Sequence, residues 1–193
     1  MKSYNVIDDH LDQDYFEHIQ NELNKAWWSL QEEVAYHGDP DSIDEAFYFV
    51  HPIFENNSPK SDMHNVLEHF YHSIGVKAII RTRAIMYMNQ GKQIVHSPHV
   101  DMHYSHNAAL FYMNDNDGFT LMADEDVEIN AKQDEDFKSP IEFSRKGGGD
   151  IFEQQNMVVS KRNRLCVHDG SRPHCSSTPT NTKKRVLIAV NYF

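Results

Sequence analysis

The hydrophobic pattern of the chain changes near residue 76, and this change limits the folds open to it. Before this point, in 14–28 and 61–73, apolar residues recur every three or four positions, which is typical of amphipathic helices. After it, short segments rich in Ile, Val and aromatic residues alternate with turn sequences, as expected for strands. The clearest strands that we predict on this basis are 76–88, 95–103, 108–113, 119–122, 164–168 and 185–193.

Helices followed by roughly eight short strands predict a mainly β protein of the α+β class with packed N-terminal helices. A β-sandwich or jelly roll is the expected architecture. The 193 residues are most simply one domain, 1–193, with a helical N-terminal part (1–75) and a β core (76–193). Because 108–113 and 119–122 flank the turn sequence Asn-Asp-Asn-Asp-Gly, we expect these two strands to pair as a hairpin.

Composition excludes several classes of function. The chain has 18 basic and 29 acidic residues, a formal net charge of −11, which argues against nucleic-acid partners because their affinity depends on Lys and Arg. The N-terminus has no apolar signal segment, and no stretch approaches the ~18 apolar residues of a membrane span. The two cysteines form no metal-binding motif and are expected to be reduced thiols. We therefore expect a cytoplasmic protein without membrane association.

Four residues far apart in the sequence have the chemistry of a metal site with an anion clamp. His99 and Asp101 are separated by one residue, so on a strand their side chains share a face. With His174 they supply the two imidazoles and one carboxylate that hold non-haem Fe(II) and leave coordination positions open. Arg185 precedes an apolar strand, where a buried guanidinium needs a partner such as a carboxylate.

The His-x-Asp pair alone is a weak signal, because the chain contains 13 histidines. His96, His103 and His106 lie close to His99 in sequence and could instead form a zinc site with it. Arg185 could be a charge at the start of a strand that reaches solvent. On residue chemistry alone these alternatives stay open.

The order of motifs across 83–193 resembles that of the 2-oxoglutarate/Fe(II)-dependent dioxygenase superfamily, and within it the prolyl-4-hydroxylase-like branch. The matching motifs are Tyr87 and Gly91, His99-Val-Asp101, the segments 110–114 and 118–121, Arg164-Leu165, Asp169-Gly-Ser171, Pro173-His174 and the final strand 185–193. A short strand at 6–7 followed by a helix is also similar to the start of these proteins. The resemblance implies a double-stranded β-helix, the cupin-like form of the jelly roll.

The resemblance also implies a role for individual residues. The implied iron ligands and catalytic residues are His99, Asp101 and His174. The implied residues of the co-substrate site are Arg185 and Tyr112 at the distal carboxylate of 2-oxoglutarate, Tyr87 near the co-substrate, and Leu121 lining the pocket. The implied cofactors are Fe(2+), 2-oxoglutarate as co-substrate, and O2.

The activity expected from this resemblance is oxidative decarboxylation of 2-oxoglutarate to succinate, coupled to hydroxylation of a substrate C–H bond. A peptidyl proline or another amino-acid side chain is the first candidate, within a wider set of small molecules, peptides and proteins. Segments 89–98 and 124–140 are expected to form the substrate lids. The alternative is a non-catalytic or zinc-binding jelly-roll module. The sequence predicts no oligomeric state.

Overall fold

The computed structural model describes residues 4–32, 47–96, 99–123 and 156–193. Within these ranges the chain is mostly β, with two antiparallel sheets and three short helices. The strands are β1 Tyr4–Ile7, β2 Ser29–Gln31, β3 Tyr48–Glu55, β4 Ser58–Pro59, β5 Ile79–Met88, β6 Asn107–Tyr112, β7 Phe119–Met122, β8 Met157–Val159, β9 Arg164–Asp169, β10 His174–Ser176 and β11 Lys184–Tyr192. The helices are α1 Gln13–Leu23, α2 Met63–Val66 and α3 Glu68–Ser73.

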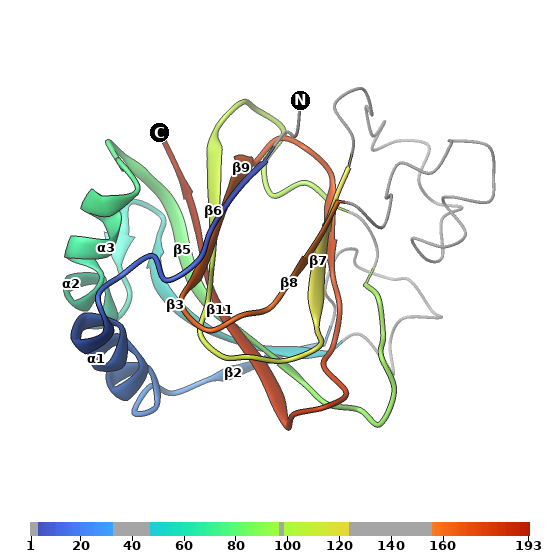
Figure 1. The fold of residues 1–193 in the computed structure, drawn as a ribbon. Helices are drawn as coiled ribbons and strands as arrows, with labels where there is room; N and C mark the ends of the chain where they lie inside the picture. The colour runs from blue at the N-terminus through green and yellow to red at the C-terminus, as the bar shows by residue number, and fades with distance from the viewer. Residues whose placement is uncertain (1–3, 33–46, 97–98, 124–155) are drawn as a thin grey trace.

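The large sheet has the order β1-β9-β6-β11-β5-β3-β2, with β4 paired to β3, and the small sheet has the order β10-β7-β8. In Figure 1 the three helices cover one face of the large sheet, while β7 and β8 lie across from its other face. The observed arrangement confirms the predicted mainly β fold class and its jelly-roll architecture.

Alternating side chains of the central strands build two cores, one on each face of the large sheet. On β6, Ala109 and Phe111 belong to the core beneath the helices, whereas Leu110 and Tyr112 face the small sheet. Phe111 is fully buried and stacks on Phe70 of α3, with 4.7 Å between ring centroids. Because side chains alternate along a strand, every second residue of the central strands faces the small sheet. We call this side of the large sheet its inner face, and its residues are the candidates for the site.

The helices are shorter than the sequence pattern predicts. The first begins after Asp12, whose side chain accepts a hydrogen bond from the Tyr15 backbone N–H, and it ends at Leu23 rather than near residue 28. The chain must leave the helix there because Ser29 already pairs with β3. The predicted helix 61–73 is divided into α2 and α3 at Leu67, which is fully buried.

Two predictions about strands need correction. The hairpin of 108–113 and 119–122 is wrong, because β6 pairs with β9 and β11, whereas β7 pairs with β8 and β10. The turn sequence between them therefore carries the chain from one sheet to the other. In 95–103 the described residues form isolated bridges at Val95 and His99 rather than a strand.

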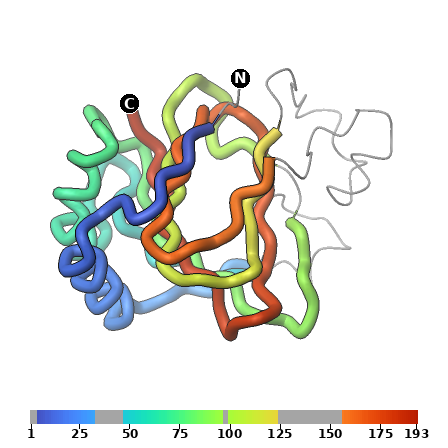
Figure 2. Tube along the Cα trace, in the orientation of Figure 1, coloured from blue at the N-terminus to red at the C-terminus, as the bar shows by residue number. Residues whose placement is uncertain are grey.

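The N-terminal part supplies strands as well as helices. β1 to β4 all join the large sheet, and β1 lies beside β9, as the tube in Figure 2 shows for these segments far apart in sequence. The predicted lid at 124–140 lies outside the described residues. Within those residues, no helix is long and apolar enough to cross a bilayer.

Candidate active site

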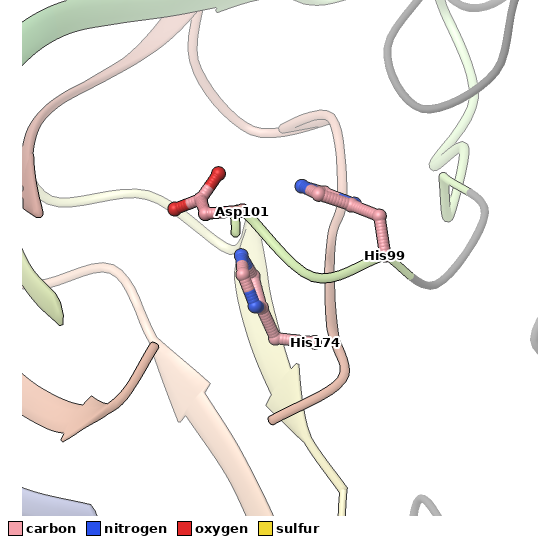
Figure 3. A group of neighbouring side chains, drawn as sticks. All are labelled: His99, Asp101 and His174. Atoms are coloured by element: carbon pink, nitrogen blue, oxygen red, sulfur yellow. The ribbon is translucent and has the colours of Figure 1, made fainter. Parts of the chain in front are cut away.

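His99, Asp101 and His174 converge at one point of the inner face. The backbones of His99 and His174 exchange two hydrogen bonds of 2.9 and 3.0 Å, which places their side chains next to each other. One nitrogen of each histidine and one carboxylate oxygen of Asp101 lie within 4.8 Å of one another. Figure 3 shows the three side chains pointing toward a common centre. This donor set, two imidazoles and one carboxylate, fits a divalent transition metal held on one side.

The local electrostatics keep His174 and Asp101 in their metal-binding protonation states. Burial lowers the pKa of His174 to about 4, so its imidazole is neutral at neutral pH. Burial acts to raise the pKa of Asp101, but the nearby His174, Arg81 and His99 outweigh it and hold that pKa below its usual value. A neutral imidazole and an ionised carboxylate are the forms that coordinate a cation.

Neighbouring groups orient two of these three side chains. Arg81 of β5 donates a hydrogen bond of 2.6 Å to Oδ1 of Asp101 as part of an ion pair. Nδ1 of His174 lies 3.3 Å from the carbonyl oxygen of Arg172, which favours the N–H tautomer at that position and turns Nε2 toward the cluster. Such outer contacts fix the geometry of metal ligands in proteins.

The cluster opens into a cavity of about 220 Å³ between the two sheets. Its wall combines the cluster with aliphatic, aromatic and basic side chains from the inner face. The lining residues are Tyr48, Arg81, Arg83, Ile85, Tyr87, His99, Val100, Asp101, Leu110, His174, Ser176, Leu187 and Ala189. Such a mixture of apolar walls and a few convergent polar groups is typical of a small-molecule site.

Arg185 is fully buried beyond Tyr87, at the start of β11. Its guanidinium donates to Ser160 Oγ, the Ser177 carbonyl and Thr120 Oγ1 at 2.7, 3.0 and 2.7 Å. All three acceptors are neutral, and no carboxylate among the described residues forms an ion pair with it. Burial lowers the pKa of Arg185, although a guanidinium stays protonated in proteins. A buried cation of this kind suits an anionic ligand.

Two tyrosines enclose the Arg185 guanidinium, whose central carbon lies 5.5 Å from both ring centroids. The Tyr112 hydroxyl donates to Thr120 Oγ1 at 3.0 Å, so this threonine oxygen accepts from both Tyr112 and Arg185. Burial raises the pKa of Tyr87 to about 12 and raises that of Tyr112 as well, so both hydroxyls remain protonated donors. The sequence-predicted residues Arg185, Tyr112 and Tyr87 are thus brought together.

Leu121 is the exception among the sequence-predicted site residues. In the small sheet it pairs with Cys175, whereas Thr120 pairs with Ser176, which lines the cavity. Because side chains alternate along a strand, Leu121 points away from the cavity, and the expectation that it lines the pocket is corrected.

The zinc alternative does not find its ligands in the described part of the chain. The nitrogens of His106 lie 2.8 Å from the Tyr104 carbonyl and 3.2 Å from Asn191 Oδ1, and His103 is exposed. Among the described residues, the one group of metal-ligating side chains is that of His99, Asp101 and His174.

Sequence reasoning missed Arg81 and Thr120. A possible signal for Arg81 was Arg83, two positions along the same strand. Residues i and i+2 of a strand share a face, so the two arginines place two positive charges on the same face. The pairing of Arg81 with Asp101 depends on how a loop meets β5, which no local pattern encodes. Thr120 gives no signal of its own in the sequence.

Thr120→Val is expected to weaken the fold around Arg185. Valine has nearly the same shape, but it removes the acceptor shared by Arg185 and Tyr112 and leaves two buried donors short of a partner. Each such loss costs about 1–3 kcal/mol, so we expect the free energy of unfolding to fall by at least about 1–3 kcal/mol.

Urea unfolding followed by circular dichroism measures this loss. Thr82→Val is the matched control, because Thr82 of β5 is equally buried but its hydroxyl makes no hydrogen bond in the structure. The control is expected to unfold near the wild-type midpoint. Equal midpoints for Thr120→Val and wild type would contradict the hydrogen-bond network described here.

Comparison with solved structures identifies the fold. A 2OG-Fe(II) oxygenase family oxidoreductase from Burkholderia pseudomallei matches with a TM-score of 0.61 at 9% identity, over 98% of this chain and 85% of that one. The chain has the fold of the 2OG-Fe(II) oxygenases. No protein-family model and no curated protein matches the sequence.

Two further structures with this fold were solved with ligands. HygX from Streptomyces hygroscopicus, with nickel and 2-oxoglutarate bound, matches with a TM-score of 0.63 at 11% identity, over 98% of this chain and 82% of that one. A prolyl hydroxylase from Trichoplax adhaerens, in complex with a hypoxia inducible factor oxygen degradation domain peptide fragment, matches with a TM-score of 0.60 at 11% identity. That match covers 99% of this chain and 83% of the other.

Proposed function

We propose that this protein is an Fe(II)- and 2-oxoglutarate-dependent dioxygenase that hydroxylates a substrate C–H bond. The observation that carries the proposal is the pairing of two features on one inner face. A cluster of two histidines and an aspartate opens into the cavity, and Arg185 lies buried beyond Tyr87 without a carboxylate partner among the described residues. A dicarboxylate with a metal-chelating end fits both features at once.

In this proposal each residue has a defined task. His99, Asp101 and His174 hold the metal, and Arg81 keeps the Asp101 carboxylate ionised and oriented. Arg185 binds the distal carboxylate of 2-oxoglutarate.

Two tyrosines complete the co-substrate site. Tyr112 supports Arg185 through Thr120 and offers a hydroxyl near it, while Tyr87 lies against the guanidinium and lines the cavity. When bound, iron with 2-oxoglutarate and O2 would supply the oxidising chemistry, and the surrounding side chains would orient the reactants and exclude water.

The overall reaction balances with O2 as the oxidant. 2-Oxoglutarate loses CO2 and becomes succinate with one oxygen atom of O2, and the second atom enters the substrate as a hydroxyl group. With ascorbate present to reduce the second oxygen atom to water, purified protein with Fe(II), 2-oxoglutarate and O2 is expected to form succinate slowly even without substrate. Succinate quantified by mass spectrometry, with 18O2 as the label source, measures this turnover.

The result also separates the alternatives. Succinate carrying one 18O atom supports the dioxygenase. Tight binding of 2-oxoglutarate without any succinate over hours would contradict it and favour a binding module. Turnover that is lost in Asp101→Ala but retained in His103→Ala would assign the activity to this site rather than to a contaminant, since His103 is exposed and outside the cluster.

For the substrate, we propose an amino-acid side chain, with a peptidyl proline as the first candidate. The support is the fold shared with a prolyl hydroxylase solved with a peptide fragment, and a cavity that contains both apolar and basic side chains. A panel of peptides and free amino acids, screened for a gain of one oxygen atom that depends on 2-oxoglutarate, tests the proposal. Hydroxylation confined to compounds without an amino-acid unit would contradict it.

A further inference from the structure

His96 is a buried histidine with no hydrogen bond to its ring. Its exposed fraction is 3%, and neither Nδ1 nor Nε2 has a partner in the structure. By contrast, His106 and His51 are also buried, and each has both ring nitrogens within hydrogen-bond distance of an oxygen atom. Leaving a buried polar atom unpaired is costly, so such a group calls for an explanation.

The position of His96 places it between the two halves of the candidate site. Its backbone N–H donates to the Ser176 carbonyl at 2.8 Å, which ties it to β10 next to His174. Its ring centroid lies 4.9 Å from that of Tyr87, which also lies against the Arg185 guanidinium. His96 therefore contacts both β10, which carries His174, and Tyr87, which lies against the Arg185 guanidinium.

The protonation state of His96 suits a neutral hydrogen-bonding role. Burial lowers its pKa to about 3, and the nearby Arg185 and His99 add to this effect. At neutral pH the ring is uncharged and carries one N–H donor. A carboxylate would accept a hydrogen bond from this N–H, and the neutral His96 ring would add no second buried charge.

We propose that His96 is a co-substrate-binding residue whose ring N–H donates a hydrogen bond to a carboxylate oxygen of 2-oxoglutarate. This inference rests on the proposed function, and it gives the unpaired His96 ring a hydrogen-bond acceptor. It also accounts for a polar ring at a buried position against Tyr87. In the bound state the carboxylate would be held by a charged donor, Arg185, and a neutral one, His96.

Two substitutions separate binding from packing. His96→Phe keeps an aromatic ring against Tyr87 but removes both nitrogens, whereas His96→Gln loses the ring and keeps a side-chain donor. We expect His96→Phe to weaken 2-oxoglutarate binding about tenfold or more, the effect of one charge-assisted hydrogen bond. We expect His96→Gln to stay within about threefold of wild type, because its amide N–H takes over the donor role.

The measurement is isothermal titration calorimetry under anaerobic conditions, in which 2-oxoglutarate is added to Mn(II)-loaded protein. The Mn(II) affinity of each variant is determined separately. His103→Phe, which changes an exposed histidine, is the control and is expected to bind as wild type does. Unchanged Mn(II) affinity with weaker 2-oxoglutarate binding in His96→Phe alone supports the inference. Wild-type 2-oxoglutarate affinity in His96→Phe, or equal losses in both His96 variants, would show a packing role and overturn it.

A failure of the proposed function looks different in the same experiment. If Mn(II)-loaded wild-type protein shows no 2-oxoglutarate binding, both the function and this inference fall. If wild type binds 2-oxoglutarate, Arg185→Met does not, and His96→Phe binds as wild type does, only the inference about His96 falls.

Discussion

The variant Asp101→Ala is expected to lose divalent-metal binding by at least about 100-fold, because even changes to residues outside the ligand shell cost about 10–100-fold. Asp101 supplies the one carboxylate of the cluster and is the partner of Arg81. Without it, Arg81 would face two imidazoles and an incoming cation with no negative charge between them. Equilibrium titration with Mn(II), monitored by electron paramagnetic resonance, measures the loss.

The other two ligands and a control complete this prediction. His99→Ala and His174→Ala are expected to lose metal binding by a similar factor, since each removes one of three donors. His103→Ala, two positions beyond Asp101 and exposed, is expected to bind metal as wild type does. An equal loss in His103→Ala, or wild-type affinity in His174→Ala, would show that the ligand assignment is wrong.

The variant Arg185→Met is expected to lose 2-oxoglutarate binding while it retains metal binding. Removing one partner of a buried charge pair costs about 2–5 kcal/mol, which corresponds to a loss of about 30-fold to several thousand-fold in affinity. Metal binding should not change, because Arg185 is not part of the metal-ligating group. Methionine keeps the unbranched apolar stem of the side chain and removes the charge together with its hydrogen-bond donors.

Ligand-induced stabilisation is a convenient readout for Arg185. At a ligand concentration of 100 times Kd, binding stabilises a protein by about 2.7 kcal/mol, so wild-type protein with Mn(II) should melt at a higher temperature when 2-oxoglutarate is added. Arg185→Met should show no such shift at the same concentration. Arg185→Lys should show a partial shift, because it keeps the charge but loses the planar fork that matches a carboxylate.

The control for this series is Arg162→Met, which changes a partly exposed arginine paired with Glu17. It is expected to leave the 2-oxoglutarate shift intact. A full shift in Arg185→Met would mean that the co-substrate carboxylate is held elsewhere, and the clamp would then be a structural arginine.

The sequence predicted the parts of the fold that depend on local periodicity. In β6 and β11, consecutive side chains face opposite cores, as the alternation of a strand predicts. Phe111, for example, lies in the core beneath the helices, and Tyr112 lies in the core that faces the small sheet. The predicted hairpin failed because a turn signal such as Asn-Asp-Asn-Asp-Gly marks a reversal of the chain but not the partner of each strand. Here the reversal connects two sheets, and that choice depends on the packing of the whole domain.

The candidate site was predictable in its residue types and less so in its geometry. His99 and Asp101 were expected to share a face of a regular strand, yet their segment forms only isolated bridges among the described residues. Their convergence comes from the backbone pairing of His99 with His174, a contact between residues 75 positions apart. The roles of Arg81, Thr120 and His96 depend on such long-range contacts, so the sequence could not predict them.

The central claim is that this site holds Fe(II) and 2-oxoglutarate together, and anaerobic visible absorption spectroscopy tests it most directly. We predict a weak new absorption band when Fe(II) and 2-oxoglutarate are both added to wild-type protein, and no band with either alone. We also predict that the band is absent in Asp101→Ala and requires much more 2-oxoglutarate in Arg185→Met. No band in wild type, or a band that forms in Arg185→Met at the same low 2-oxoglutarate concentration, would contradict the account.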